Sequence, residues 1–346
     1  MCNIAGYIGE RDAAPILIDM IREQEGLNGG FYTGIATLHE GKIYYRKVVG
    51  DLDELLRRTD AASLPGKIGI IHSRTPGDLG DEWAHPFVCE RDGEVFTAQV
   101  YNGSLGFFKD LNPKRAALAA ELLSEGYKMR SFVPESNGKN LTLNDGSRVH
   151  ISDLMCQLVS KNILGGEPAH RAMELSYCEI PAEIVGLMLS VTEPDAIAFA
   201  RMNMPMFVSY GDDGAYLASA PQAFPDGLSD PHLFPVFSSG YIKKDGFSCA
   251  PFKKAPSTVA PITESVRHRA YEKIYSALLE EKQTLSSLAK LANTCFDDAD
   301  CKQSATLAYS ILYDLKKRGL LKVKKDTKPG VFDGLTAPVY YLWVKQ

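Results

Sequence analysis

The chain has 346 residues, of which 45% are hydrophobic and 23% are charged, and its formal net charge is −5. These values describe an ordinary globular protein of about two domains. No apolar run approaches the roughly 18 residues that a membrane helix needs, and no basic segment followed by an apolar one marks a secretion signal. The sequence therefore predicts a cytoplasmic protein that does not enter a membrane.

Seven cysteines are spread widely through the chain. They are Cys2, Cys89, Cys156, Cys178, Cys249, Cys295 and Cys301. An odd number without a CxxC pair favours a reducing compartment and argues against a disulfide framework or a zinc site. We expect no metal and no cofactor.

The charge is distributed unevenly between the two ends of the sequence. Residues 265–346 carry 14 lysines and arginines against 9 acidic residues, whereas the rest of the chain is acidic. This contrast indicates two modules with different partners.

The sequence begins with Met1-Cys2-Asn3, in which a small residue follows the initiator methionine. Removal of Met1 would leave Cys2 with a thiol and a free α-amine on one carbon. Such an amine has an ordinary pKa of roughly 7.7–8.0, so it can exchange a proton with the thiol near neutral pH. Cys2 is therefore a candidate nucleophile, although an ordinary residue near a disordered start would look the same.

The first predicted elements alternate between strands and short helices. They are a strand over residues 3–9, a helix from Ala13 to about Gln24, a hairpin of residues 33–38 and 42–48, and a helix from Asp51 to Arg58. A further apolar strand over residues 67–75 delivers Arg74 at its end. A guanidinium there can bind a carboxylate with two parallel hydrogen bonds, or it can serve as a surface salt-bridge partner. His85, which precedes a proline, is interpreted as a structural loop histidine.

A strand over residues 95–103 ends in Asn102-Gly103. The pair is a common hairpin turn. It can instead provide two donors for a developing oxyanion, the side-chain amide of Asn102 and the backbone N–H of Gly103. Glycine leaves that N–H accessible because it has no Cβ.

Taken together, these segments resemble the class II glutamine amidotransferases, and most closely the glutaminase domain of glucosamine-6-phosphate synthase. The resemblance rests on Met-Cys-x-Ile-x-Gly-x-x-Gly, Ile-His-Ser-Arg-Thr-Pro, His-Pro-Phe and Asn-Gly in that order. It continues through residues 149–155, which are similar to the family's Ser-Asp-Thr-Glu segment at a helix start, and a final strand pair within 201–220. It covers about residues 2–225.

The resemblance implies an α+β fold, the four-layer αββα sandwich of N-terminal nucleophile hydrolases. It also implies a role for each matching residue. Cys2 would form a thioester with glutamine, while Asn102 and Gly103 would stabilise the oxyanion. Arg74 and Thr75 would bind the substrate, with Arg74 on its α-carboxylate. Asp153 would hold the α-ammonium, although Asp153 also suits a plain helix N-cap.

Two segments depart from the family pattern. The loop after Arg74 is shorter than the family's and lacks its tryptophan and histidine. The stretch from Leu105 to Leu143 is longer than expected, with a predicted turn at Asn137-Gly138-Lys139. This stretch could cover the site or bind a partner.

The sequence divides the chain into three parts. They are an amidotransferase domain over 1–246, a Pro- and Lys-rich linker over 247–264 and a second domain over 265–346. The second domain is predicted to hold helices over 265–281, 284–292 and 304–318 and then a hairpin of 320–325 and 338–344. This order resembles a small winged-helix domain.

A winged helix that reads DNA exposes polar and basic residues on its third helix and its wing. The third helix here offers Thr306, Ser310, Tyr313, Asp314 and Lys317. The wing offers Lys322, Lys324, Lys325 and Lys328. DNA and a protein partner are equally open as ligands of residues 265–346.

The residues after the linker do not resemble a sugar isomerase domain. We therefore expect one of three outcomes for glutamine. Its ammonia passes to an acceptor or synthase subunit on another chain, the domain is a glutaminase or amide hydrolase, or the chain senses glutamine and reports through residues 265–346.

Overall fold

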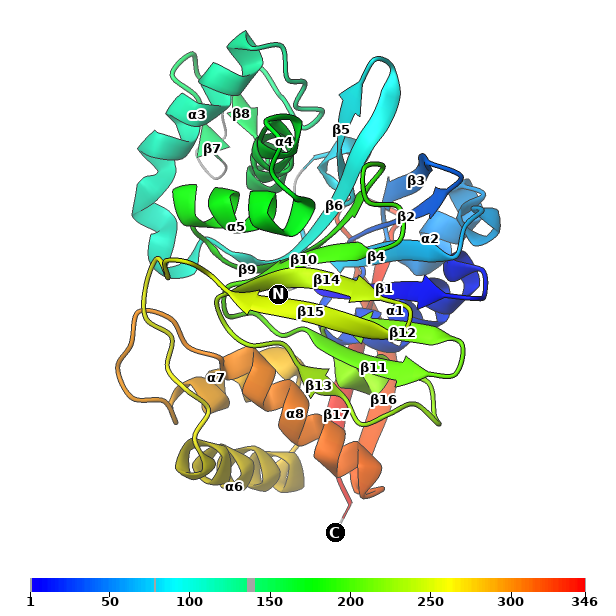
Figure 1. Cartoon of the computed structure of the whole chain (residues 1–346). Coiled ribbons are helices and arrows are strands. Elements are labelled where there is room, and N and C mark those ends of the chain that lie inside the picture. The colour runs from blue at the N-terminus through cyan, green and yellow to red at the C-terminus, as the bar shows by residue number, and fades with distance from the viewer. Residues whose placement is uncertain (1, 78, 136–140, 346) are drawn as a thin grey trace.

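The computed structural model describes residues 2–77, 79–135 and 141–345. Met1 and the turn predicted at Asn137-Gly138-Lys139 lie outside these residues. Two antiparallel sheets lie face to face at the centre of the first domain (Figure 1).

The first sheet contains the strand that follows Cys2. Its members are β1 (Asn3–Gly9), β2 (Tyr32–His39), β3 (Lys42–Val49), β4 (Ile68–Arg74), β11 (Phe207–Gly211), β12 (Gly214–Ala218) and β13 (His232–Leu233). They pair in the order β13-β11-β12-β1-β4-β2-β3, so β1 lies in the middle of the sheet. The predicted hairpin of residues 33–38 and 42–48 is confirmed as β2 and β3.

The second sheet contains the strand with Asn102 and Gly103. Its members are β5 (Phe87–Arg91), β6 (Glu94–Ser104), β9 (Glu183–Ser190), β10 (Ile197–Arg201), β14 (Ser238–Lys243) and β15 (Gly246–Pro251). They pair in the order β15-β14-β10-β9-β6-β5. Ile4 and Ile70 of the first sheet pack with Val100 and Leu187 of the second, so the space between the sheets is a continuous apolar core.

Helices cover the outer face of each sheet. On the first sheet, α1 (Ala13–Asn28) packs against β1 and β4, with α2 (Leu52–Arg58) beside it. On the second, α4 (Ile151–Leu164) and α5 (Ala169–Glu179) form the outer layer, and α3 (Asn112–Ser124) packs on α4. The expected α+β fold with four αββα layers is confirmed.

The C-terminal module, residues 264–345, contains three helices and a hairpin. They are α6 (Glu264–Glu280), α7 (Leu285–Asn293), α8 (Ser304–Lys317), β16 (Leu321–Pro329) and β17 (Thr336–Val344). The short strands β7 (Leu141–Thr142) and β8 (Arg148–Val149) complete the fold. The module agrees with the predicted elements, while its identification as a winged helix stays a prediction.

The predicted linker begins too early. Residues 246–251 form β15, which pairs with β14 along its whole length. Most of β15 is exposed, because it is the edge strand of the sheet. The lysines and most of the prolines that suggested a linker follow β15, and a proline at the end of an edge strand is tolerated, so Pro251 does not exclude a strand.

The prediction that one face of the third helix is exposed is also wrong in part. Thr306 of α8 is fully buried, and its hydroxyl accepts a hydrogen bond from Arg201 of β10. Lys317 pairs with Asp230 of the first domain, and Lys316 donates to the Gln222 carbonyl. The helix that would enter a DNA groove therefore lies against the amidotransferase domain. Among the described residues no helix is both long and apolar enough to cross a membrane.

Candidate active site

Both sheets contribute to one cavity at the start of β1. Cys2 immediately precedes β1, and the pairing of Asn3 with Ser73 brings the end of β4, with Arg74, to the same edge. Asn102 reaches across from β6, and its Oδ1 accepts a hydrogen bond of 2.7 Å from the Cys2 nitrogen. The structure thus brings together the predicted nucleophile, the predicted oxyanion residues and the predicted carboxylate ligand.

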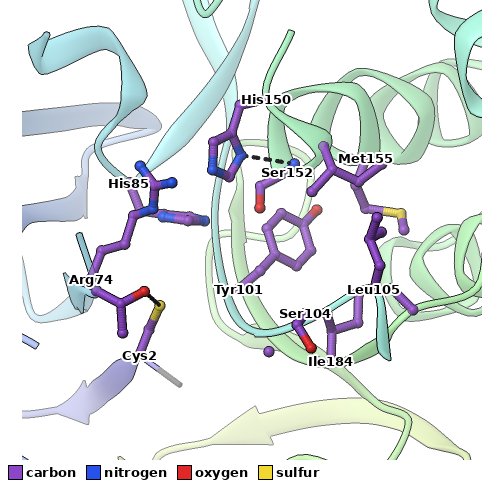
Figure 2. A pocket seen from close by; sticks show the side chains of 14 residues that line it. Cys2, Arg74, His85, Tyr101, Ser104, Leu105, His150, Ser152, Met155 and Ile184 are labelled. Carbon is purple, nitrogen blue, oxygen red and sulfur yellow. Dashed lines mark hydrogen bonds between the residues drawn. The ribbon is translucent and has the colours of Figure 1, made fainter. Parts of the chain in front are cut away.

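The cavity has a volume of about 170 Å³. Figure 2 shows the side chains that line it. The cavity is lined by Cys2, Arg74, Thr75, His85, Tyr101, Gly103, Ser104, Leu105, His150, Ile151, Ser152, Met155, Ala182 and Ile184. This volume is below the roughly 300–1,000 Å³ of sites for drug-sized ligands, so the cavity suits a small metabolite.

The side-chain amide of Asn102 is oriented by Cys2. Because the Cys2 nitrogen is a donor, the amide must present its oxygen to it, which turns the NH₂ group elsewhere. That nitrogen, Nδ2, is buried and has no hydrogen-bond partner among the described residues. An unpaired buried donor costs about 1–3 kcal/mol. Asn102 itself is not among the residues that line the cavity, whereas the adjacent Gly103 is.

Gly103 lies inside β6 rather than in a hairpin turn, which rules out the turn interpretation of Asn102-Gly103. Its φ of 146° lies in a region that residues with a side chain rarely adopt. A Cβ at this position would also lie 1.9 Å from the Glu183 carbonyl oxygen of β9. Close approach of the neighbouring strand therefore requires glycine on this wall of the cavity.

The Cys2 thiol is nearly inaccessible to solvent, and its surroundings alter its acidity. Burial raises the pKa of the thiol, but His72, the N-terminal amine and a hydrogen bond from the Thr75 backbone together outweigh burial and lower the pKa to about 6. His72 belongs to β4 and is fully buried. A pKa near 6 means that the nucleophilic thiolate predominates at neutral pH.

The rate of Cys2 alkylation by iodoacetamide should rise as pH increases through about 6 and level off near pH 7. The direction follows because the depressed pKa makes thiolate available above pH 6. Peptide mass spectrometry over a pH series measures the rate at each cysteine. Exposed Cys249 is the control inside the same molecule. A Cys2 profile that keeps rising to pH 9 would contradict the lowered pKa.

Arg74 at the end of β4 and Thr75 directly after it line the cavity. The Arg74 Nη1 donates to the Trp83 carbonyl at 2.9 Å, and its guanidinium lies over the Tyr32 ring. The Thr75 hydroxyl is 3.9 Å from the Cys2 sulfur. Both predicted substrate-binding residues therefore line the cavity.

Asp153, predicted to hold the substrate ammonium, does not line the cavity. Its carboxylate is buried and accepts hydrogen bonds from the backbone and hydroxyl of Ser131 and from Gln157. Burial raises the pKa of this carboxyl. It is not the cap of α4 either, because His150 occupies that position and accepts from the Ser152 N–H. The hydrogen bonds of Asp153 therefore connect α4 to the segment around Ser131.

Three histidines form a cluster that the sequence did not identify as part of the site. His72 and His85 stack with ring centroids 3.9 Å apart, and His150 lies 5.7 Å from His85. His85 is a buried loop residue, as interpreted, but it also forms a wall of the cavity. Its burial lowers its pKa well below the usual value, so its ring is neutral. Within the described ranges, no three side chains of the metal-ligating types are arranged to hold a metal ion.

Several known proteins are similar to this chain. Glutamine–fructose-6-phosphate aminotransferase of Pyrococcus horikoshii is 29% identical over 226 residues, which are 65% of this chain and 33% of the relative. The enzyme of the same name from Chlorobaculum tepidum is 33% identical over 223 residues, or 63% of this chain and 32% of the relative. The chain thus spans about a third of the length of these relatives. No model of a protein family matches it.

Solved structures share the fold. Glutamine phosphoribosylpyrophosphate amidotransferase from B. subtilis superposes with a TM-score of 0.59 at 16% identity, covering 81% of this chain and 58% of the other. A structure described as the allosteric regulatory enzyme of purine biosynthesis gives a TM-score of 0.58 at 14% identity, covering 97% of this chain and 67% of the other. The first domain therefore has the fold seen in class II amidotransferase structures.

Proposed function

We propose that this chain, which contains a class II glutamine amidotransferase domain, hydrolyses the side-chain amide of glutamine through an N-terminal Cys2. The observation that carries the proposal is the geometry of Asn102. Its oxygen binds the Cys2 nitrogen while its NH₂ group stays buried and unpaired beside the nucleophile. A donor left unpaired at this place suits an oxyanion that exists only during reaction.

The reaction begins with the Cys2 thiolate attacking the amide carbon of glutamine. The carbonyl oxygen becomes an oxyanion, which Asn102 Nδ2 and the Gly103 N–H stabilise. After removal of Met1 the α-ammonium of Cys2 donates a proton to the leaving nitrogen, so the C–N bond breaks and ammonia departs. The amine then takes a proton from water, which attacks the thioester, and glutamate and the free thiolate result.

Glutamine also needs a partner for its α-carboxylate, and Arg74 supplies a guanidinium on the cavity wall. Lysine in its place would keep the charge but lose the two-pronged hydrogen bond. Arg74→Lys should raise the KM for glutamine by about 10- to 100-fold, as expected for a lost charged hydrogen bond. Steady-state kinetics measure the change. Arg11→Lys, in an exposed ion pair with Asp213, is the matched control and should leave KM unchanged. An unaltered KM in Arg74→Lys would exclude Arg74 as the partner of the substrate α-carboxylate.

The proposed function is tested with purified full-length protein. Intact mass first shows whether Met1 has been removed. Processed protein should release glutamate and ammonia in equal amounts from glutamine, and glutamine should outcompete other primary amides. Absence of turnover by processed protein would overturn the proposal, and faster hydrolysis of another amide would reassign the substrate.

The remaining candidate functions differ in what happens to the ammonia. The relatives are named for amino transfer to fructose 6-phosphate. For this chain we propose an acceptor or synthase subunit on another chain, with free hydrolysis as the basal reaction. A glutamine-sensing regulator acting through a winged helix is the second candidate. Its DNA-binding version loses support because α8 lies against the first domain.

A further inference from the structure

The C-terminal module reaches the strand of the nucleophile from the side opposite to the thiol. Successive side chains of a strand point to opposite faces, so Asn3 points away from the cavity that Cys2 lines. Asn3 is fully buried between the first sheet and the helices. Its Nδ2 donates to the Gln24 carbonyl of α1 at 2.8 Å, and its Oδ1 accepts from the Tyr309 hydroxyl of α8 at 3.0 Å.

Tyr309 is itself held in place. It is fully buried, and its backbone carbonyl accepts from Gln222 Nε2 at 2.9 Å. Burial raises the pKa of its phenol, so the hydroxyl stays protonated and remains a donor to Asn3. The contact therefore joins the residue beside the nucleophile to a fixed point on the C-terminal module.

The position of α8 is set by polar contacts around a buried cation. Arg201 of β10 is almost fully buried, and its guanidinium donates to Gln303 Oε1 at 2.9 Å and to the Met204 carbonyl at 2.6 Å. Burial lowers the pKa of Arg201 to about 9. A buried cation tolerates little loss of its partners, so α8 has one defined register against the first domain.

The hairpin of the module approaches the other side of the site. The Tyr340 ring of β17 packs so closely on α1 that a Cβ at Gly26 would lie 2.1 Å from it, and the Tyr340 hydroxyl donates to the Arg22 carbonyl. Further along, Ala337 is buried with Tyr32 and Trp83. Leu79, Val331 and Leu335 pack on the same cluster.

The members of this cluster hold Arg74. Trp83 accepts a hydrogen bond from the Arg74 guanidinium, and Tyr32 lies beneath that guanidinium. The Tyr32 hydroxyl in turn donates to the Leu79 carbonyl at 2.7 Å, in the loop that follows Arg74. This loop is the segment that is shorter than in the resembling family, and the end of the hairpin packs against it.

We propose that the C-terminal module is a built-in support of the glutamine site, in which Tyr309 is a positioning residue for Cys2 and the hairpin end supports the Arg74 loop. The expected changes in kcat and KM rest on the proposed function, glutamine hydrolysis. Once Met1 is removed, Cys2 is joined to the chain only through Asn3, so the side-chain contacts of Asn3 restrain the nucleophile. Misplacement of a reacting group by about 1 Å can cost about 100-fold in rate.

Tyr309→Phe removes one hydroxyl and should lower kcat by about 10- to 100-fold while KM for glutamine stays within about twofold. Tyr340→Phe is the matched control, because it removes a hydroxyl with which the same module contacts α1 away from Cys2. Both variants should lower Tm by roughly 2–4 °C, which shows an equal structural cost. Equal kcat in the two variants would overturn the role of Tyr309.

Leu335→Ala tests the hairpin end and should raise KM for glutamine more than it lowers kcat. Phe332→Ala, at an exposed position of the same turn outside the cluster, should change neither value. If the two variants behave alike, the hairpin does not support the Arg74 loop.

Alkylation of Cys2 separates this inference from the proposed function. Wild-type protein without glutamine turnover would defeat the proposed function alone. In that case Tyr309→Phe should still change the rate of Cys2 alkylation relative to Cys249, and Tyr340→Phe should not. Identical alkylation of Cys2 in wild type and Tyr309→Phe would overturn the positioning role whether or not glutamine is hydrolysed.

Discussion

Replacing Cys2 with alanine should abolish glutamine hydrolysis, with kcat falling by at least about 10⁴-fold. The thiol provides the only bond to the acyl group in the proposed reaction, so no neighbouring group can replace it. The variant should still bind glutamine, because Arg74 and the cavity wall are unchanged. Release of glutamate measures the first effect and an upward shift of Tm with glutamine measures the second. Activity within tenfold of wild type would exclude Cys2 as the nucleophile.

Cys89→Ala is the matched control for Cys2→Ala. Cys89 is also buried, but it lies in β5 outside the cavity, and burial raises the pKa of its thiol to about 11. Its thiol is therefore protonated at neutral pH and unsuited to attack. The variant should keep kcat close to that of wild type even if it loses some stability.

The strands that carry the site could be predicted from the sequence because their signals are local. β1 and β4 are short apolar runs, and each adjoins a polar site residue, Cys2 or Arg74. The order of these motifs along the chain then matched one family, and that match supplied the two-sheet arrangement. Periodicity alone would not have shown that β6 lies opposite β1.

The parts that sequence reasoning missed depend on contacts between distant segments. The stacking of His72 on His85 joins β4 to a loop, and His150 comes from the start of α4. Each histidine looks like an isolated polar residue in the sequence. All three histidines lie within segments that carried the family resemblance, Ile-His-Ser-Arg-Thr-Pro, His-Pro-Phe and residues 149–155, but their clustering became clear only with the fold.

The docking of α8 was missed for a similar reason. Thr306 is a small polar residue on a helix, which usually indicates a solvent-facing position. Here its hydroxyl faces the buried guanidinium of Arg201, which lies about a hundred residues earlier. Asp153 illustrates the same limit, since the sequence identified its helix correctly but not the serine and glutamine that engage its carboxylate.

The alternation of side chains about Cys2 explains why both faces of β1 matter to the site. The thiol is on the cavity side and is adjusted by His72, while Asn3 is on the helix side and is held by α1 and α8. In the proposed reaction Cys2 therefore depends on both faces of the strand: on one face the sheets set the acidity of its thiol, and on the other face α1 and α8 hold the adjoining Asn3.

Asn102→Ala should lower kcat by about 10²- to 10³-fold, the usual cost of removing one oxyanion donor. The loss would have two sources, because Asn102 Nδ2 is the proposed donor to the oxyanion and Asn102 Oδ1 accepts a hydrogen bond from the Cys2 nitrogen. KM for glutamine should change little, since the oxyanion forms only after binding. Stopped assays of glutamate release over a range of glutamine concentrations separate the two constants.

Asn203→Ala is the control that makes the Asn102 result specific. Asn203 is equally buried, and its amide nitrogen donates to Glu183 and to the Lys302 carbonyl outside the cavity. Its loss should lower Tm without the large fall in kcat. If both variants lose activity in proportion to Tm, Asn102 is structural and the oxyanion role fails. If Asn102→Ala keeps its Tm yet loses turnover, the unpaired nitrogen beside Cys2 serves the reaction rather than the fold.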